Sequence, residues 1–105
     1  MSDFTTVARV GAIPEGRGIT VVVNGRLVAV FLDRGEYKAI DDLCPHMGAS
    51  LGAGEVYEGA VACPWHAWRF DLSRGTWCDN PKLKVDAFET RVVGEEIQVR
   101  VPPKT

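Results

Sequence analysis

The sequence predicts an all-β fold, and three observations support this. Strand-like segments that alternate apolar and polar residues recur along most of the chain. Turns that contain glycine or proline separate these segments, and the periodicity of amphipathic helices is nearly absent. The length of 105 residues suits one compact domain, and 46% hydrophobic with 25% charged residues is ordinary globular composition. We therefore expect a single β domain that spans residues 1–105.

The N-terminal part of the chain predicts four strands. They cover residues 4–9, 19–23, 26–32 and 37–41. Asn24-Gly25 separates the second and third strands and suits the positive φ angles that a type I′ turn requires. The sequence therefore predicts a tight hairpin at this point.

The C-terminal part predicts further short strands around two loops. The loops lie near residues 44–50 and 63–67, and the strands between and after them cover residues 55–57, 60–62, 68–72, 76–78, 88–93 and 96–101. Asn80-Pro81 is expected to break the chain before the last pair of strands. Ile97, Val99 and Val101 alternate with polar residues in the final strand, which predicts one buried face.

The charge and hydropathy of the chain exclude several classes of function. Lys and Arg number 12 against 14 Asp and Glu, so the net charge is −2 and a basic nucleic-acid-binding face is not expected. The longest apolar run, residues 27–32, is far shorter than the ~20 residues of a membrane helix. Residues 1–10 lack the basic and apolar regions of a signal peptide. We expect a cytoplasmic protein with no nucleic-acid or membrane partner.

Two short motifs place cysteine and histidine close together on turns stiffened by proline. They read C-P-H at residues 44–46 and C-P-W-H at residues 63–66, and they contain the only 2 histidines of the chain. Two thiolates and two imidazoles suit a 2Fe-2S cluster in which cysteines hold one iron and histidines hold the other. The candidate ligands are Cys44, His46, Cys63 and His66.

Two alternatives use the same residues. A tetrahedral zinc site has the same ligand count, but zinc sites usually show paired-cysteine knuckles and histidines spaced on a helix. A disulfide between Cys44 and Cys63 leaves both histidines unexplained. The third cysteine, Cys78, falls on a predicted strand beside Trp77, and we expect it to be a small buried hydrophobic residue.

The two motifs resemble the cluster-binding loops of Rieske ferredoxins. Residues 44–51, CPHMGASL, are similar to the first loop, and residues 63–72, CPWHAWRFDL, are similar to the second loop and its exit hairpin. The resemblance implies an antiparallel β-sandwich with a small cluster-binding subdomain made of two loops, at about residues 43–51 and 62–68. It also implies that Cys44 and Cys63 bind the inner iron, and that His46 and His66 bind the outer iron of one 2Fe-2S cluster.

The sequence departs from the high-potential members of that family. Those proteins brace the loops with a disulfide, and the matching positions here are Ala49 and Trp65. They also place serine and tyrosine hydroxyls near the cluster sulfurs, where this chain has Ala67 or Trp68, and Phe70. Hydroxyl hydrogen bonds favour the reduced cluster, so we expect a potential near the low end of the Rieske range, ~−150 mV.

The histidine count favours an electron carrier over an enzyme. A Rieske oxygenase needs a second iron held by two further histidines and a carboxylate, and no further histidine remains in this chain. We therefore expect a ferredoxin that takes electrons from a flavin-dependent reductase and passes them to a terminal oxygenase. The resemblance equally allows the small subunit of an NAD(P)H-dependent assimilatory nitrite reductase, bound to its large subunit. An iron- or redox-sensing interaction protein is the alternative of another class.

Acidic residues near the loops have two interpretations. Asp41, Asp42, Glu55 and Glu58 could form a negative collar that attracts a basic reductase. Ordinary solvated turn charges are the simpler interpretation, which we prefer.

Overall fold

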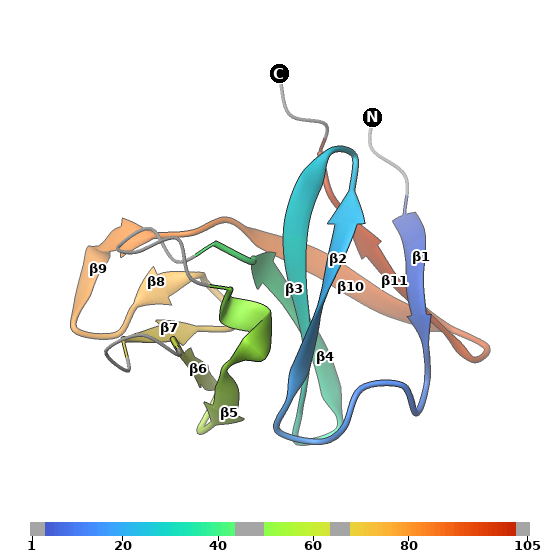
Figure 1. Cartoon of the computed structure of the whole chain (residues 1–105), viewed down its shortest axis with the longest axis horizontal. Coiled ribbons are helices and arrows are strands. Elements are labelled where there is room, and N and C mark those ends of the chain that lie inside the picture. The colour runs from blue at the N-terminus through green and yellow to red at the C-terminus, as the bar shows by residue number, and fades with distance from the viewer. Residues whose placement is uncertain (1–3, 44–49, 64–67, 103–105) are drawn as a thin grey trace.

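The fold consists of two antiparallel β-sheets, as the computed structural model shows for residues 4–43, 50–63 and 68–102 (Figure 1). Within these ranges the larger sheet has the strand order β1 (Phe4–Arg9), β11 (Glu96–Arg100), β10 (Ala87–Val93), β4 (Glu36–Asp41), β3 (Arg26–Asp33) and β2 (Gly18–Val23). The smaller sheet has the order β5 (Glu55–Tyr57), β6 (Ala60–Ala62), β7 (Arg69–Asp71), β8 (Thr76–Trp77) and β9 (Asn80–Lys84). The predicted all-β class is confirmed.

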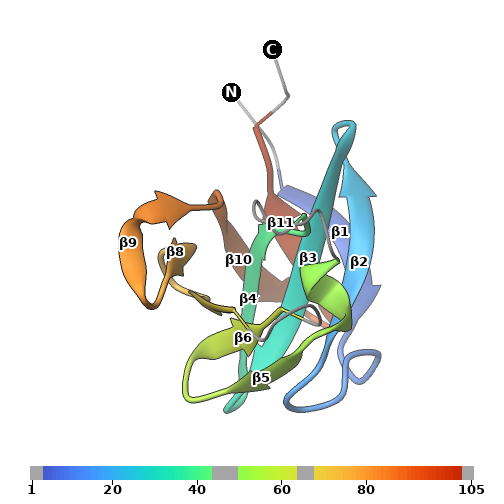
Figure 2. The same ribbon diagram turned by 60° about the vertical axis from the view of Figure 1, so that its left-hand side comes forward.

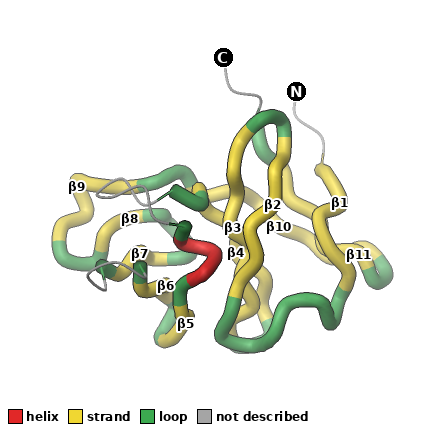
Figure 3. The backbone as a smooth tube through the Cα atoms, viewed as in Figure 1, coloured by secondary structure: helices red, strands yellow, loops and turns green. Residues whose placement is uncertain are grey.

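In the described part of the chain, one short helical turn accompanies the sheets. The 3-10 helix η1 (Leu51–Ala53) lies between the smaller sheet and the β2–β3 hairpin (Figure 3). In the described ranges, no helix has the length and apolar character needed to cross a membrane.

The hairpin between β2 and β3 has the predicted turn. Asn24 and Gly25 both have positive φ, 51° and 77°, as a type I′ turn requires. The Asn24 side chain also donates a hydrogen bond to the Val101 carbonyl at 2.6 Å, which ties the hairpin to the end of β11. The hairpin is thereby anchored to a segment that is distant in the sequence.

Strand β3 is buried on both of its faces because it lies between two hydrophobic cores. Val28 and Val30 belong to the core inside the larger sheet, together with the inward-facing residues of β11. Ala29 and Phe31 point the other way, into the core shared with the smaller sheet. Figure 2 shows this smaller sheet to one side of the larger one. Two-sided burial explains why this strand reads as a continuous apolar run rather than an alternating one.

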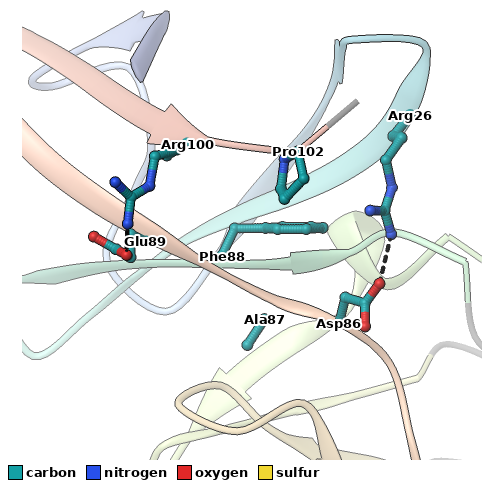
Figure 4. Close-up of a pocket in the computed structure, with 7 residues that line it drawn as sticks. All are labelled: Arg26, Asp86, Ala87, Phe88, Glu89, Arg100 and Pro102. Atoms are coloured by element: carbon teal, nitrogen blue, oxygen red, sulfur yellow. Dashed lines mark hydrogen bonds and ion pairs between the residues drawn. The ribbon is translucent and has the colours of Figure 1, made fainter. Parts of the chain in front are cut away.

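An arginine connects three segments where the chain crosses between the two sheets. Arg26 Nη2 lies 2.9 Å from Asp41 Oδ1 at the end of β4. It also lies 2.8 Å from Asp86 Oδ2 in the segment before β10, the pair drawn in Figure 4. The backbone N–H of Asp86 also donates to Asp41 Oδ2 at 3.0 Å. The hydrogen bond to Asp86 raises the pKa of the Arg26 guanidinium, which burial alone would lower. The junction is thus held by a cation between two carboxylates.

Two expectations for the segment after β8 were wrong. Asn80-Pro81 does not break the chain: it begins strand β9, which pairs with β8 through Trp77 and Asn80. The proline is tolerated because β9 is an edge strand, where a missing N–H removes no hydrogen bond from the interior of the sheet. Cys78 is not a buried strand residue, since it lies in the turn between β8 and β9 and is exposed.

Candidate metal centre

The first predicted cluster loop begins and ends on residues that pair with one another. Its central residues 44–49, which include Cys44 and His46, lie outside the described residues. On either side of them, Leu43 and Ser50 form an antiparallel bridge. The Leu51 N–H donates to the Asp42 carbonyl at 2.6 Å. Both ends of the loop are therefore held at one point.

The carboxylate of Asp42 lies at that same point. Asp42 is only 2% exposed. Its Oδ1 accepts hydrogen bonds from Thr20 Oγ1 at 2.9 Å, Ser50 Oγ at 2.9 Å and the Gly52 N–H at 2.8 Å. Asp42 itself precedes the loop, whereas two of the donors follow the loop and the third belongs to strand β2, so one oxygen atom joins three segments.

The acidic residues near the loops do not act as a group. Asp42 is buried, which contradicts both the collar and the solvated-charge interpretation for this residue. Asp41 is in the ion pair with Arg26. Glu55 and Glu58 are exposed, as expected for solvated charges.

The second predicted loop also closes on its own ends. His66 is among residues 64–67, outside the described part of the chain, whereas Cys63 is described and is 2% exposed. The Cys63 N–H donates to the Trp68 carbonyl at 2.6 Å. Cys63 belongs to the core between the sheets, together with Leu51 and Phe70. One candidate ligand is thus presented from the hydrophobic interior, out of contact with water.

Two tryptophans stack against that core. The rings of Trp68 and Trp77 are nearly parallel, with centroids 3.9 Å apart and an interplanar angle of 9°. Nε1 of Trp77 is buried and has no hydrogen-bond acceptor among the residues that the structure describes. A buried thiol and an unsatisfied N–H donor in one core fit an anionic group that contains sulfur.

The described residues contain no group of three or more potential metal ligands. Of the four candidate ligands, the structure places Cys63 alone, so the complete ligand set stays a prediction. Sequence reasoning named Asp42 only as a surface charge, and it did not identify the partners Thr20 and Gly52. The two adjacent aspartates before the first motif were the available signal, but their burial depends on contacts with β2.

A hollow of about 520 Å³ lies on the larger sheet, away from Cys63. It is lined by Arg26, Asp86, Ala87, Phe88, Glu89, Arg100 and Pro102 (Figure 4). Arg26 is paired with Asp86, and Arg100 with Glu89. The charges of its two arginines are already balanced, so we assign it no ligand.

Comparison with known proteins identifies the family. Residues 3–99 match the family model of the Rieske [2Fe-2S] domain. The chain belongs to the Rieske family. A Rieske domain carries one 2Fe-2S cluster, and the buried Cys63 fits such a group.

The relatives of this Rieske domain include proteins of similar and of much greater length. It is 38% identical over 90 residues to the ferredoxin component of the naphthalene 1,2-dioxygenase/salicylate 5-hydroxylase systems of Ralstonia sp, covering 85% of this chain and 86% of that protein. It is 33% identical over 96 residues to apoptosis-inducing factor 3 of Mus musculus, covering 90% of this chain but spanning only 16% of the length of that relative. Among solved structures, one from Mycobacterium tuberculosis, described as an NADH-dependent nitrite reductase small subunit, superposes with a TM-score of 0.91 at 28% identity over 99% of both chains.

Proposed function

We propose that the protein is a one-electron carrier that receives electrons from a flavin-dependent reductase and passes them to a terminal oxygenase. The observation that carries this proposal is the similarity to the Ralstonia ferredoxin component, which extends over most of both chains. The sequence supports it, because its 2 histidines suffice for one Rieske cluster and leave none for the mononuclear iron of an oxygenase.

The proposed ligands are Cys44 and Cys63 on the inner iron, and His46 and His66 on the outer iron. The loops that present them span about residues 43–51 and 62–68 of a single domain. The burial of Cys63 supports the inner position of its thiolate, since a buried sulfur ligand keeps that side of the site dry. When bound, the cluster supplies reversible storage of one electron.

The protein's own residues hold this site and exclude water from it. Leu51 and Phe70 are fully buried in the same core as Cys63. Phe70 offers a ring without a hydroxyl, so it donates no hydrogen bond that would favour the reduced state. Its burial supports a carrier of low potential, near the bottom of the Rieske range.

A test of the cluster begins with anaerobic purification and reconstitution. We expect about two irons and two inorganic sulfides per chain, with the EPR signal of a mixed cysteine–histidine cluster after reduction. Cys63→Ser and His66→Ala should lose that signal. Cys78→Ser is the matched control, because its thiol is exposed in a turn and should leave the signal unchanged. A colourless protein that binds stoichiometric zinc would contradict the proposal.

A nitrite reductase small subunit is the second candidate, favoured by the superposition over the full length of the Mycobacterium tuberculosis structure. The two candidates differ in how they meet their partners. A diffusing carrier should be reduced at a rate proportional to reductase concentration and should purify alone. A permanent subunit should co-purify with a large flavoprotein. Either role suits the cytoplasm, where we place the protein.

A sensor that reports cluster occupancy to a partner is the remaining candidate. Rapid reduction by a reductase, followed by rapid oxidation by an oxygenase, is expected of a carrier. A cluster that exchanges electrons slowly while partner binding changes with its occupancy would favour the sensor.

A further inference from the structure

The hydrogen bonds of Asp42 differ from those of a surface carboxylate. Three donors converge on one oxygen, Oδ1, at distances of 2.8 to 2.9 Å. Two are the hydroxyls of Thr20 and Ser50, which also lie 3.1 Å from each other. The third is the backbone N–H of Gly52. Three short hydrogen bonds to one oxygen stabilise a carboxylate better than a neutral amide, since charged acceptors form the stronger bonds.

The contacts are placed so that they control the first loop. Asp42 precedes residues 44–49, and Ser50 and Gly52 follow them, while Thr20 belongs to strand β2 of the larger sheet. The two chain ends of the loop are thus fixed to each other and to a sheet whose core is fully buried. Fixing both ends removes conformations that the loop would otherwise have to lose when the cluster binds.

The packing around this carboxylate leaves no spare room. A Cβ atom added at Gly52 would lie 2.3 Å from Thr20 Oγ1 and 2.9 Å from Asp42 Oδ1. Only glycine lets the backbone approach the carboxylate this closely. The absence of a side chain at residue 52 is therefore part of the same arrangement.

We infer that Asp42 is the positioning residue of the first cluster loop: through Thr20, Ser50 and Gly52 it attaches that loop to the larger sheet. This inference rests on the proposed function, in which Cys44 and His46 bind the cluster. Asp42 acts on the cluster only through the geometry of the loop. Groups that hydrogen-bond directly to metal ligands typically change metal affinity 10- to 100-fold when mutated, and we take that range as the scale for a residue that holds both ends of a ligand loop.

The experiment compares Asp42→Ala and Asp42→Asn in the cluster-loaded protein. Cluster loss is followed by visible absorbance in the presence of an iron chelator. We expect Asp42→Ala to lose its cluster about 10- to 100-fold faster than the unaltered protein. Asp42→Asn keeps an acceptor at Oδ1 and should recover part of the difference. Ser50→Ala and Thr20→Val each remove one donor and should accelerate cluster loss about two- to tenfold.

Asp33 provides a matched control. It is 8% exposed and is the last residue of β3. Asp41 pairs with Val28, which lies toward the other end of that strand. Asp33 lies five residues from Val28, or about 17 Å along the strand. Asp33→Ala and Asp33→Asn test whether the loss of any buried carboxylate has the same effect. They should change the rate of cluster loss less than twofold.

Two further readouts separate positioning from general stability. The EPR g values of the reduced cluster should shift in Asp42→Ala and not in Asp33→Ala. Hydrogen exchange at the Gly52 N–H should accelerate in Asp42→Ala, because this amide donates directly to the carboxylate. If Asp42→Ala does not fold, Ser50→Ala and Thr20→Val decide the question by the same measurements.

The outcomes distinguish this inference from the proposed function. If the Asp42, Ser50 and Thr20 variants keep the g values and the rate of cluster loss of the unaltered protein, the positioning role is overturned. A normal Rieske signal in the unaltered protein would then leave the carrier function intact. The absence of any cluster from the unaltered protein would overturn both.

Discussion

Arg26 offers a quantitative test of how the segment that crosses between the two sheets is held to the larger sheet. We consider Arg26→Met, which keeps an unbranched side chain of similar length but removes the guanidinium. The bond to Asp41 is partly buried, with side chains 17% and 25% exposed, and a hydrogen bond to a charged group there contributes about 1.5–3 kcal/mol. The bond to Asp86 contributes less than about 1 kcal/mol, because that carboxylate is 61% exposed and screened by solvent.

The arginine also lies over an aromatic ring. Its guanidinium carbon is 4.9 Å from the centroid of Phe88, a cation–π contact of about 0.5–1 kcal/mol. These contributions together predict that Arg26→Met lowers the free energy of unfolding by about 2–5 kcal/mol. The measurement is urea unfolding of the cluster-loaded protein under anaerobic conditions, followed by far-UV circular dichroism.

Arg9→Met is the control for this measurement. Arg9 pairs with Glu95 at 3.1 Å, but both side chains are at least 75% exposed. Such a pair contributes less than about 1 kcal/mol. Equal losses in Arg26→Met and Arg9→Met would refute the reasoning that partial burial makes the Arg26 contacts strong. So would a double variant, Arg26→Met with Asp41→Asn, whose loss equals the sum of the two single losses.

Three other positions test the smaller sheet, the ligand set and the surface. A methyl group at Gly54 would lie 2.1 Å from the Ala62 carbonyl oxygen, so Gly54→Ala should lower the free energy of unfolding by about 1–3 kcal/mol; an unchanged urea midpoint would contradict this. If a cluster still assembles, His66→Cys should lower the reduction potential through its added negative charge, and an equal or higher potential in film voltammetry would oppose the assigned ligand. The Thr6 hydroxyl lowers the pKa of Glu96, so the stability from this contact is present above pH 4.5 and disappears as pH falls through the lowered pKa. Thr6→Val should bring the pKa measured by NMR back toward 4.5.

The strands were predictable from the sequence to within about one residue at most positions. The β2–β3 turn is set by Asn24 and Gly25 themselves, which tolerate positive φ, so distant contacts were not needed to predict it. Strand β9 was missed because proline is a local signal for a break. Proline can occur in this strand because, among the described strands, β9 pairs only with β8, at the edge of the sheet. That position in the sheet cannot be predicted from the neighbouring residues.

In the candidate site, too, features set by neighbouring residues were predicted, and features set by distant contacts were not. The two cysteine–histidine motifs identified the cofactor from residue type and spacing alone, and the family match agrees. Burial was harder to predict. Cys78 was expected inside and is exposed, whereas Asp42 was expected in solvent and is buried. In each case the outcome depends on which strands pack around the residue.

The amino-acid sequence by itself determined the β class and the tight hairpin, and it predicted the residues that bind the cluster, because each of these depends on neighbouring residues and their intrinsic preferences. The tertiary structure alone decided that β3 is covered on both faces, that Arg26 holds the segment before β10 against the larger sheet, and that a carboxylate joins the two ends of the first loop. These features arise between segments far apart in the chain. Their energies come from burial and from hydrogen-bond geometry, which exist only after the sheets have packed.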